Sequence, residues 1–257
     1  TVANRNHNRT GYWGPPNALH QFCEPHYAST AYVAEFYNSI SSLVFPAVAV
    51  YALTKSEAWE CAVCWVALAI VGLGSCAFHA TMQWQHELWD EVPMVGFMAT
   101  CMLAKAEAHP ALTTRARRSA FRLATLSMAV GTVGAYVVLQ AYEFFVLAFT
   151  GLVVVDTALA LSCGPPSPAK WFCFCASVGA IITGKLAWEV ENRWCAVAPS
   201  VWPLHVMWHF LAAASAYYGV LFNILNRFEA GIRSAALPAA AVESGRLPPP
   251  PPPPPPP

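Results

Sequence analysis

The sequence predicts an all-α polytopic membrane protein, a bundle of seven transmembrane helices. Of its 257 residues, 56% are hydrophobic and only 11% are charged, whereas a soluble domain carries about 25% charged residues. The apolar residues also gather in runs close to the ~20 residues that a membrane-spanning helix needs. Because the formal net charge is zero, the chain lacks the basic surface that nucleic acid requires, and we expect no such partner.

The composition divides the chain into three parts. Residues 1–30 are polar and turn-rich, and we expect them to lie outside the membrane. Residues 31–227 hold the apolar runs and form the predicted seven-helix transmembrane domain. Residues 228–257 are rich in Ala and Pro and end in an unbroken proline run, Pro248 to Pro257, which favours polyproline II and cannot pack a core. We interpret them as a flexible tail, and the alternative is that the proline run binds a proline-recognising domain.

The apolar runs define the predicted helices in order. They lie at about 32–54, 62–84, 92–108, 119–140, 143–163, 170–190 and 202–226. Charged, Gly-rich or Pro-rich breaks separate most of them, at 55–60, 85–91, 109–118, 164–168 and 191–200. A tight turn near Ala141 divides the fourth run from the fifth.

The distribution of Lys and Arg predicts the orientation of this bundle, because short cytoplasmic loops are enriched in positive charge. The odd-numbered loops and the segment after the last run hold Lys55, Arg115, Arg117, Arg118, Lys170, Arg227 and Arg233, and the other side holds Arg5, Arg9 and Arg193. The C-terminus is therefore predicted to be cytosolic and the N-terminus luminal. Seven spans also place Cys23 and Cys195 together on the luminal face, where disulfides persist.

Three histidines in the apolar runs are candidate zinc ligands. His205 and His209 are four residues apart and share one helix face, and His79 from another helix can complete a set of three nitrogen ligands. Ionisable side chains in membrane-length segments are expensive and are usually functional. Zinc lowers the pKa of bound water to about 7, and Asp90 would then act as a general base. The alternative is that these histidines are hydrogen-bonded packing residues.

Ser75 and Asp90 also have simpler interpretations. Ser75 follows Gly74 and could be a small residue at a helix–helix contact. Asp90 could be the N-cap of the third helix, with Pro93 in its first turn.

Several separated motifs agree with one family in their order and spacing between about residues 20 and 225. They are Cys23-Glu24, the run from Ala34 to Ser41, Gly74-Ser75, Phe78-His79, Leu88, Asp90-Glu91, Pro93-Met94, Trp188, Glu191-Asn192, Cys195, His205 and Trp208-His209. In these motifs the chain resembles the alkaline ceramidases, integral membrane amidases of the ceramidase and adiponectin-receptor-like superfamily.

The resemblance implies a zinc-dependent hydrolase of ceramide-type lipids that releases a sphingoid base and a free fatty acid. It places the zinc on His79, His205 and His209, the catalytic side chains at Ser75 and Asp90, and a disulfide between Cys23 and Cys195. Ser75 would donate a hydrogen bond to the oxyanion, and Asp90 would take the proton of the attacking water. We expect an integral membrane protein of the endoplasmic reticulum, the Golgi or both, surrounded by membrane lipids.

The family's calcium segment is only partly preserved. It has an acidic residue, an aromatic residue, Cys-Glu, any residue and then Asn, followed by a later Glu. Here Gln21 replaces the acid and His26 replaces the Asn, whereas Glu24 and Glu35 remain. Because calcium prefers 6–8 oxygen ligands, we expect at most a weak calcium site at Glu24 and Glu35, and we do not assume calcium dependence. The alternative is that Glu35 is a buried carboxylate paired with His26.

Two other functions are consistent with a helical membrane bundle. One is a receptor of the adiponectin-receptor type, in which zinc is structural and the N-terminus is cytosolic. The other is a transporter that uses Asp156, Lys185 and Glu189 in the membrane.

Overall fold

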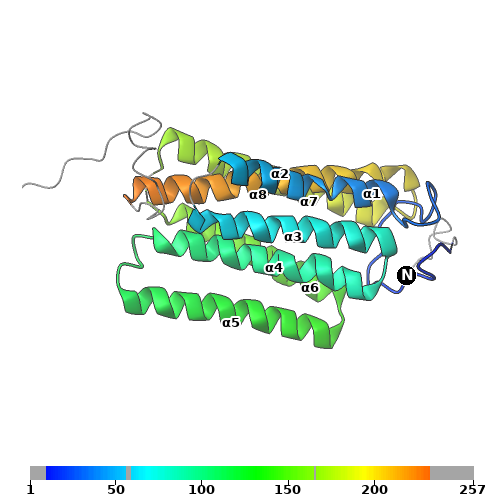
Figure 1. The fold of residues 1–257 in the computed structure, drawn as a ribbon, viewed down its shortest axis with the longest axis horizontal. Helices are drawn as coiled ribbons and strands as arrows, with labels where there is room; N and C mark the ends of the chain where they lie inside the picture. Colours follow the sequence, from blue (N-terminus) through cyan, green and yellow to red (C-terminus); the bar gives the residue numbers. More distant parts are fainter. Residues whose placement is uncertain (1–9, 56–58, 165, 232–257) are drawn as a thin grey trace, which may run out of the picture.

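The computed structural model describes residues 10–55, 59–164 and 166–231, and this part of the chain is an elongated bundle of helices that run alongside one another (Figure 1). The α-helices are α1 (Phe36–Ser41), α2 (Val44–Lys55), α3 (Trp59–Thr81), α4 (Trp84–Glu107), α5 (Arg115–Leu139), α6 (Tyr142–Leu161), α7 (Pro168–Trp194) and α8 (Pro203–Glu229), with a short 3-10 helix η2 (Pro199–Val201) before α8. The all-α prediction is confirmed.

Each predicted apolar run falls on a helix, and the first is divided between α1 and α2. The predicted break at 85–91 is wrong, because it lies wholly inside α4, which begins at Trp84, so Met82 and Gln83 alone separate α3 from α4. Asp90 is therefore within a helix and is not an N-cap. The predicted breaks at 109–118 and 191–200 are shorter than expected, because α5 begins at Arg115 and α7 ends at Trp194.

The early start of α4 has a tertiary cause. The carboxylate of Glu87, in the first turn, accepts hydrogen bonds from the backbone N–H groups of Leu19 and His20, at 2.7 and 3.2 Å. This side chain is buried, although its charge suggested an exposed loop.

The other ends follow local sequence signals. Thr114 and Ser167 cap α5 and α7 by accepting the N–H groups of Arg117 and Lys170, both at 3.2 Å. Gln140, in the left-handed conformation with φ of 47°, ends α5 and makes the tight turn into α6.

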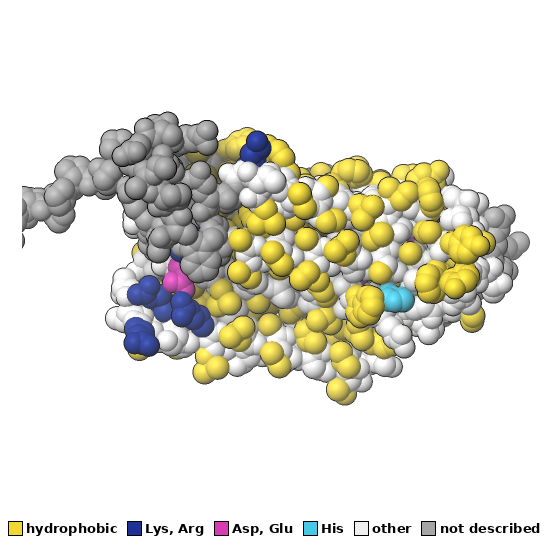
Figure 2. Space-filling model, viewed as in Figure 1, with side chains coloured by type: hydrophobic (Ala, Val, Ile, Leu, Met, Phe, Trp, Pro, Cys, Tyr) yellow, Lys and Arg dark blue, Asp and Glu magenta, His cyan; other side chains and the backbone are white. Residues whose placement is uncertain are grey.

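Five helical stretches in the described residues are long and apolar enough to cross a membrane: Phe36–Lys55, Cys61–Thr81, Arg115–Leu139, Tyr142–Leu161 and Pro168–Trp194. Hydrophobic side chains cover the visible face of the bundle, and Lys and Arg side chains gather near the end where α4 leads into α5 (Figure 2). That α4 and α8 also cross the membrane, and that the N-terminus is luminal and the C-terminus cytosolic, remain predictions.

The N-terminal segment packs against the opposite end of the bundle, near the end of α3 and the start of α8. Phe22 and Tyr27 join a buried cluster with Phe78 and Met82. A disulfide links Cys23 to Cys195, with their Cα atoms 5.4 Å apart. The segment is thereby attached to the loop between α7 and α8.

Candidate metal centre

Three buried imidazoles converge at this end of the bundle. His79 comes from the last turn of α3, and His205 and His209 come from the first turns of α8. Their ligand-capable atoms all lie within 4.8 Å of one another, and each residue is at most 2% exposed. The structure thus brings together the three histidines that the sequence singled out, in a group that could hold a metal ion.

Each imidazole is held through its Nδ1 atom by a side chain from another element. The pairs are His79 with Glu35 Oε2 at 2.7 Å, His205 with Glu191 Oε2 at 3.1 Å, and His209 with Ser41 Oγ at 2.7 Å. The hydroxyl of Ser41 also donates to the carbonyl of Asn38 at 3.1 Å, so it accepts from His209. Protons on the three Nδ1 atoms leave the three Nε2 atoms available to a metal ion.

This donor set fits zinc. Metal-binding histidines usually donate their second ring N–H to a carboxylate or another acceptor, which fixes both the tautomer and the ring orientation. Three neutral imidazoles leave a fourth tetrahedral position open, as catalytic zinc sites do.

The residues that hold the imidazoles were not identified as such from the sequence. For Glu35 the sequence predicts at most a weak calcium site, with pairing to His26 as the alternative, and the structure shows the His26 pair. Glu191 and Ser41 appear at the sequence level only inside family motifs. A signal was present for Glu191, because a carboxylate in an apolar helix needs a partner. The partner itself, His205, belongs to a different helix.

The disulfide-linked segment covers this centre. The backbone N–H of Cys23 donates to Glu191 Oε1 at 2.8 Å, so Glu191 connects the segment to His205. The ring of Phe22 lies against the His205 imidazole, with centroids 3.9 Å apart. The N-terminal segment therefore shields the centre and orients one of its imidazoles.

Glu35 lies at the start of α1 and is fully buried. Its Oε1 atom pairs with His26 Nε2 at 3.2 Å, and its Oε2 atom accepts from His79 and from the Asn38 amide at 3.0 Å. Both oxygens of Glu35 thus have N–H partners, which a buried carboxylate requires.

Glu24 has a different role. Its two oxygens accept the backbone N–H groups of Tyr37 and Asn38, each at 2.8 Å, and so satisfy the first turn of α1. All four carboxylate oxygens of Glu24 and Glu35 thus face N–H donors. Calcium prefers a cage of oxygens, and the groups around these two carboxylates do not fit it.

Ser75 and Asp90 meet across the contact between α3 and α4. Both side chains line the same cavity, and Ser42 Oγ lies 3.0 Å from Ser75 Oγ. Gly74 permits this approach, because a Cβ atom there would overlap the backbone carbonyl of Trp89. Ser75 is therefore part of a polar network, in addition to lying at a helix contact.

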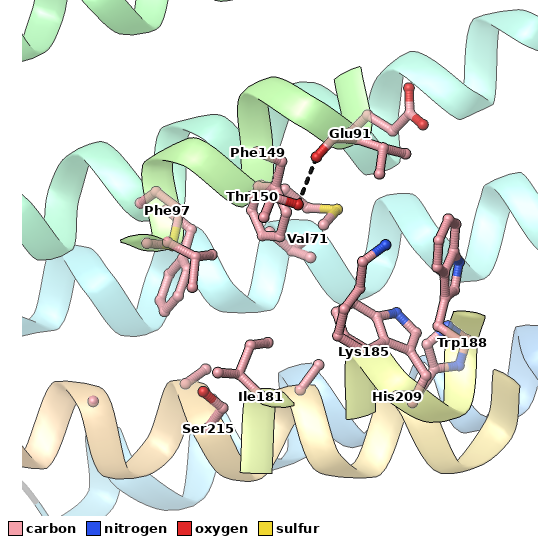
Figure 3. A pocket seen from close by; sticks show the side chains of 18 of the residues that line it. Val71, Glu91, Phe97, Phe149, Thr150, Ile181, Lys185, Trp188, His209 and Ser215 are labelled. Carbon is pink, nitrogen blue, oxygen red and sulfur yellow. Dashed lines mark hydrogen bonds between the residues drawn. The ribbon is translucent and has the colours of Figure 1, made fainter. Parts of the chain in front are cut away.

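A cavity of about 410 Å³ begins at this centre, where Ser75, Asp90, His205 and His209 line it. Its walls are mainly apolar side chains of α4, α6, α7 and α8, and Figure 3 shows Phe97, Phe149 and Ile181 facing the cavity with Lys185, Trp188 and His209 at one end. Lys105 and Asp156 also line it. The fifteen residues from Asp90 to Lys105 along α4 correspond to a length of ~22 Å.

The cavity reaches the outer surface of the bundle between α6 and α7. Val154 of α6 and Ile182 and Leu186 of α7 line it and are also more than half exposed. A long apolar molecule could therefore enter sideways, from the medium around the helices.

Comparison with known proteins gives a consistent result. The family model described as Ceramidase matches residues 14–238. The chain is 26% identical over 237 residues to alkaline ceramidase 3 of Mus musculus, covering 85% of this chain and 87% of that protein. It is 27% identical over 242 residues to the alkaline ceramidase of Arabidopsis thaliana, with 85% and 87% coverage. A putative alkaline ceramidase of Dictyostelium discoideum, dcd3B, is 27% identical over 265 residues, with 86% and 91% coverage.

Proposed function

The chain belongs to the ceramidase family, and from this premise we propose that it is a zinc-dependent membrane amidase. Its substrates are ceramide-type lipids, and its products are a sphingoid base and a free fatty acid. The observation that carries the proposal is the set of three buried imidazoles, each held through Nδ1 by a side chain from another element.

The proposed zinc ligands are the Nε2 atoms of His79, His205 and His209. When bound, zinc lowers the pKa of its water to about 7. Asp90 accepts a proton from the attacking water and delivers it to the leaving amine. Ser75, which lines the same cavity as Asp90, turns its hydroxyl towards the oxyanion that forms on the amide carbonyl.

The apolar cavity holds the acyl chain. Its opening between α6 and α7 faces the bilayer interior in the proposed orientation, so the substrate enters from the membrane without passing through water. The amide of the substrate then lies near Ser75 and Asp90. The N-terminal segment, which contacts the metal centre through Phe22 and Cys23, covers it.

The proposed topology has seven spans, with α1 and α2 forming one and with α4 and α8 included. The N-terminus is luminal and the C-terminus cytosolic, in the endoplasmic reticulum or the Golgi. The Lys and Arg side chains near the start of α5 support this direction. The Cys23–Cys195 disulfide supports an oxidising compartment on the opposite side. The proline run Pro248–Pro257, which the sequence predicts to be a flexible tail with binding to a proline-recognising domain as the alternative, lies outside the described residues.

The test uses full-length protein and two variants expressed in the same membranes. His205→Ala removes a proposed ligand, and His109→Ala removes a histidine that contacts Ser162 at the far end of the bundle. We expect the parent and His109→Ala to bind zinc and release sphingoid base from ceramides, and His205→Ala to lose both properties.

Two results would overturn the proposal. Zinc binding without hydrolysis of any N-acyl sphingoid would favour the receptor with structural zinc, and a tag at Thr1 accessible from the cytosol would agree with it. A parent protein that binds no zinc would mean that the three histidines are packing residues.

A further inference from the structure

His26 is a buried histidine close to the metal centre and is not one of its ligands. It lies in the N-terminal segment and is 0% exposed. Its Nε2 atom contacts Glu35 Oε1 at 3.2 Å, and Glu35 Oε2 contacts His79 Nδ1 at 2.7 Å. One carboxylate therefore connects His26 to the proposed zinc ligand His79.

Two buried carboxylates lie together at this point. Glu24 and Glu35 are 3% and 0% exposed, and burying carboxylates is costly unless they are paired and hydrogen-bonded. The ion-pair partners of Glu35 in the described part of the chain are His26 and His79. The backbone N–H groups at the start of α1 donate hydrogen bonds to Glu24.

A calcium ion would neutralise two such carboxylates by binding them together with additional oxygen ligands. The resemblance to the alkaline ceramidases predicts those oxygens at positions 21 and 26. Here Gln21 is exposed and His26 presents a ring nitrogen to Glu35. An Asn at position 26 would offer a carbonyl oxygen to calcium. The imidazole of His26 is directed at the Glu35 carboxylate instead.

We propose that His26 is a positioning residue that replaces calcium: it fixes Glu35, which in turn orients His79, and the enzyme works without calcium. This inference rests on the proposed function for its activity readout and concerns a different residue and a different ion. His26 contacts neither substrate nor zinc and acts through Glu35.

The experiment compares the full-length parent with His26→Leu, His26→Gln and the double variant Gln21→Asp/His26→Asn. Each purified protein is assayed for ceramide hydrolysis and for thermal unfolding, with and without calcium chloride, at a free zinc concentration held constant by a zinc buffer. His26→Gln retains an N–H donor, His26→Leu removes it, and the double variant restores the two oxygens.

We expect calcium to change neither the rate nor the Tm of the parent. His26→Leu should lower zinc affinity and turnover roughly tenfold, the lower end of the range for residues that orient a metal ligand, and His26→Gln should recover most of the loss. The double variant should regain activity when calcium is added, and its Tm should rise with calcium because a ligand that binds the folded state stabilises it.

The inference is overturned if removing calcium inactivates the parent, if calcium raises the Tm of the parent, or if His26→Leu retains full zinc affinity. If His26→Leu fails to fold, the parent's response to calcium and the His26→Gln variant still decide the question. A parent that hydrolyses no ceramide would overturn the proposed function, whereas its Tm with calcium would still test the replacement.

Discussion

The two ends of the bundle both bury charged side chains, but they do so differently. At the end near the start of α5, Lys105 pairs with Asp156 and Lys170 pairs with Glu229, both at 2.8 Å. Each ammonium there meets a carboxylate, and the two charges satisfy one another.

At the other end, the carboxylates meet imidazoles. Glu35 holds His79 and Glu191 holds His205, and each ring keeps its second nitrogen for another partner. Burial of charge in a helical membrane protein is therefore not sufficient to indicate a site. What distinguishes the metal end is that its paired groups retain ligand atoms that converge on one point.

Among variants that test this difference between the two ends, Asp90→Asn is expected to have the largest effect, on turnover. The amide retains the size of the carboxyl group and its capacity for hydrogen bonds but cannot accept the proton of water, so turnover should fall by roughly 10²–10⁴-fold. Zinc content should stay at the parent level, because Asp90 is not a proposed ligand. The measurement is sphingoid base release per mole of bound zinc, and parent-level turnover would remove Asp90 from the mechanism.

An intermediate effect is expected from Glu191→Gln, which weakens the acceptor that orients His205. Zinc affinity should fall roughly 10–100-fold, as is usual for residues that orient metal ligands, and competition with a chelator measures it. Glu189→Gln is the matched control, because Glu189 lies on the same helix and pairs with Lys185 and Arg193 and not with an imidazole. Equal zinc affinity in both variants would contradict the role of Glu191.

The smallest effect on the metal end is expected from Lys105→Met. This change leaves Asp156 beside an apolar side chain and should lower the free energy of unfolding by about 3–5 kcal/mol, with unchanged zinc affinity. The double variant Lys105→Met/Asp156→Leu should recover most of that stability, because neither charge is left unpaired. Denaturant titration in detergent measures both, and loss of zinc in the folded double variant would show that the two ends are coupled.

Much of the fold could be predicted from the sequence because membrane-length helices have a local cause. Each apolar run satisfies its backbone hydrogen bonds within itself, so the run at 143–163 predicts α6 whatever its neighbours are. The start of α4 was missed because Glu87 is paired with backbone groups of Leu19 and His20, sixty-seven or more residues earlier in the chain. The charge of Glu87 resembles a loop signal in the sequence, but in the structure this side chain makes a tertiary contact.

The residues alone predicted the helical class and singled out the histidines, because i and i+4 spacing puts His205 and His209 on one face of any helix. The sequence also pointed to Ser75 and Asp90 through their place in the motifs. The sequence could not show which nitrogen of each histidine remains available to a metal ion. That depends on Glu35, Glu191 and Ser41, which come from other elements and whose distances no sequence spacing sets.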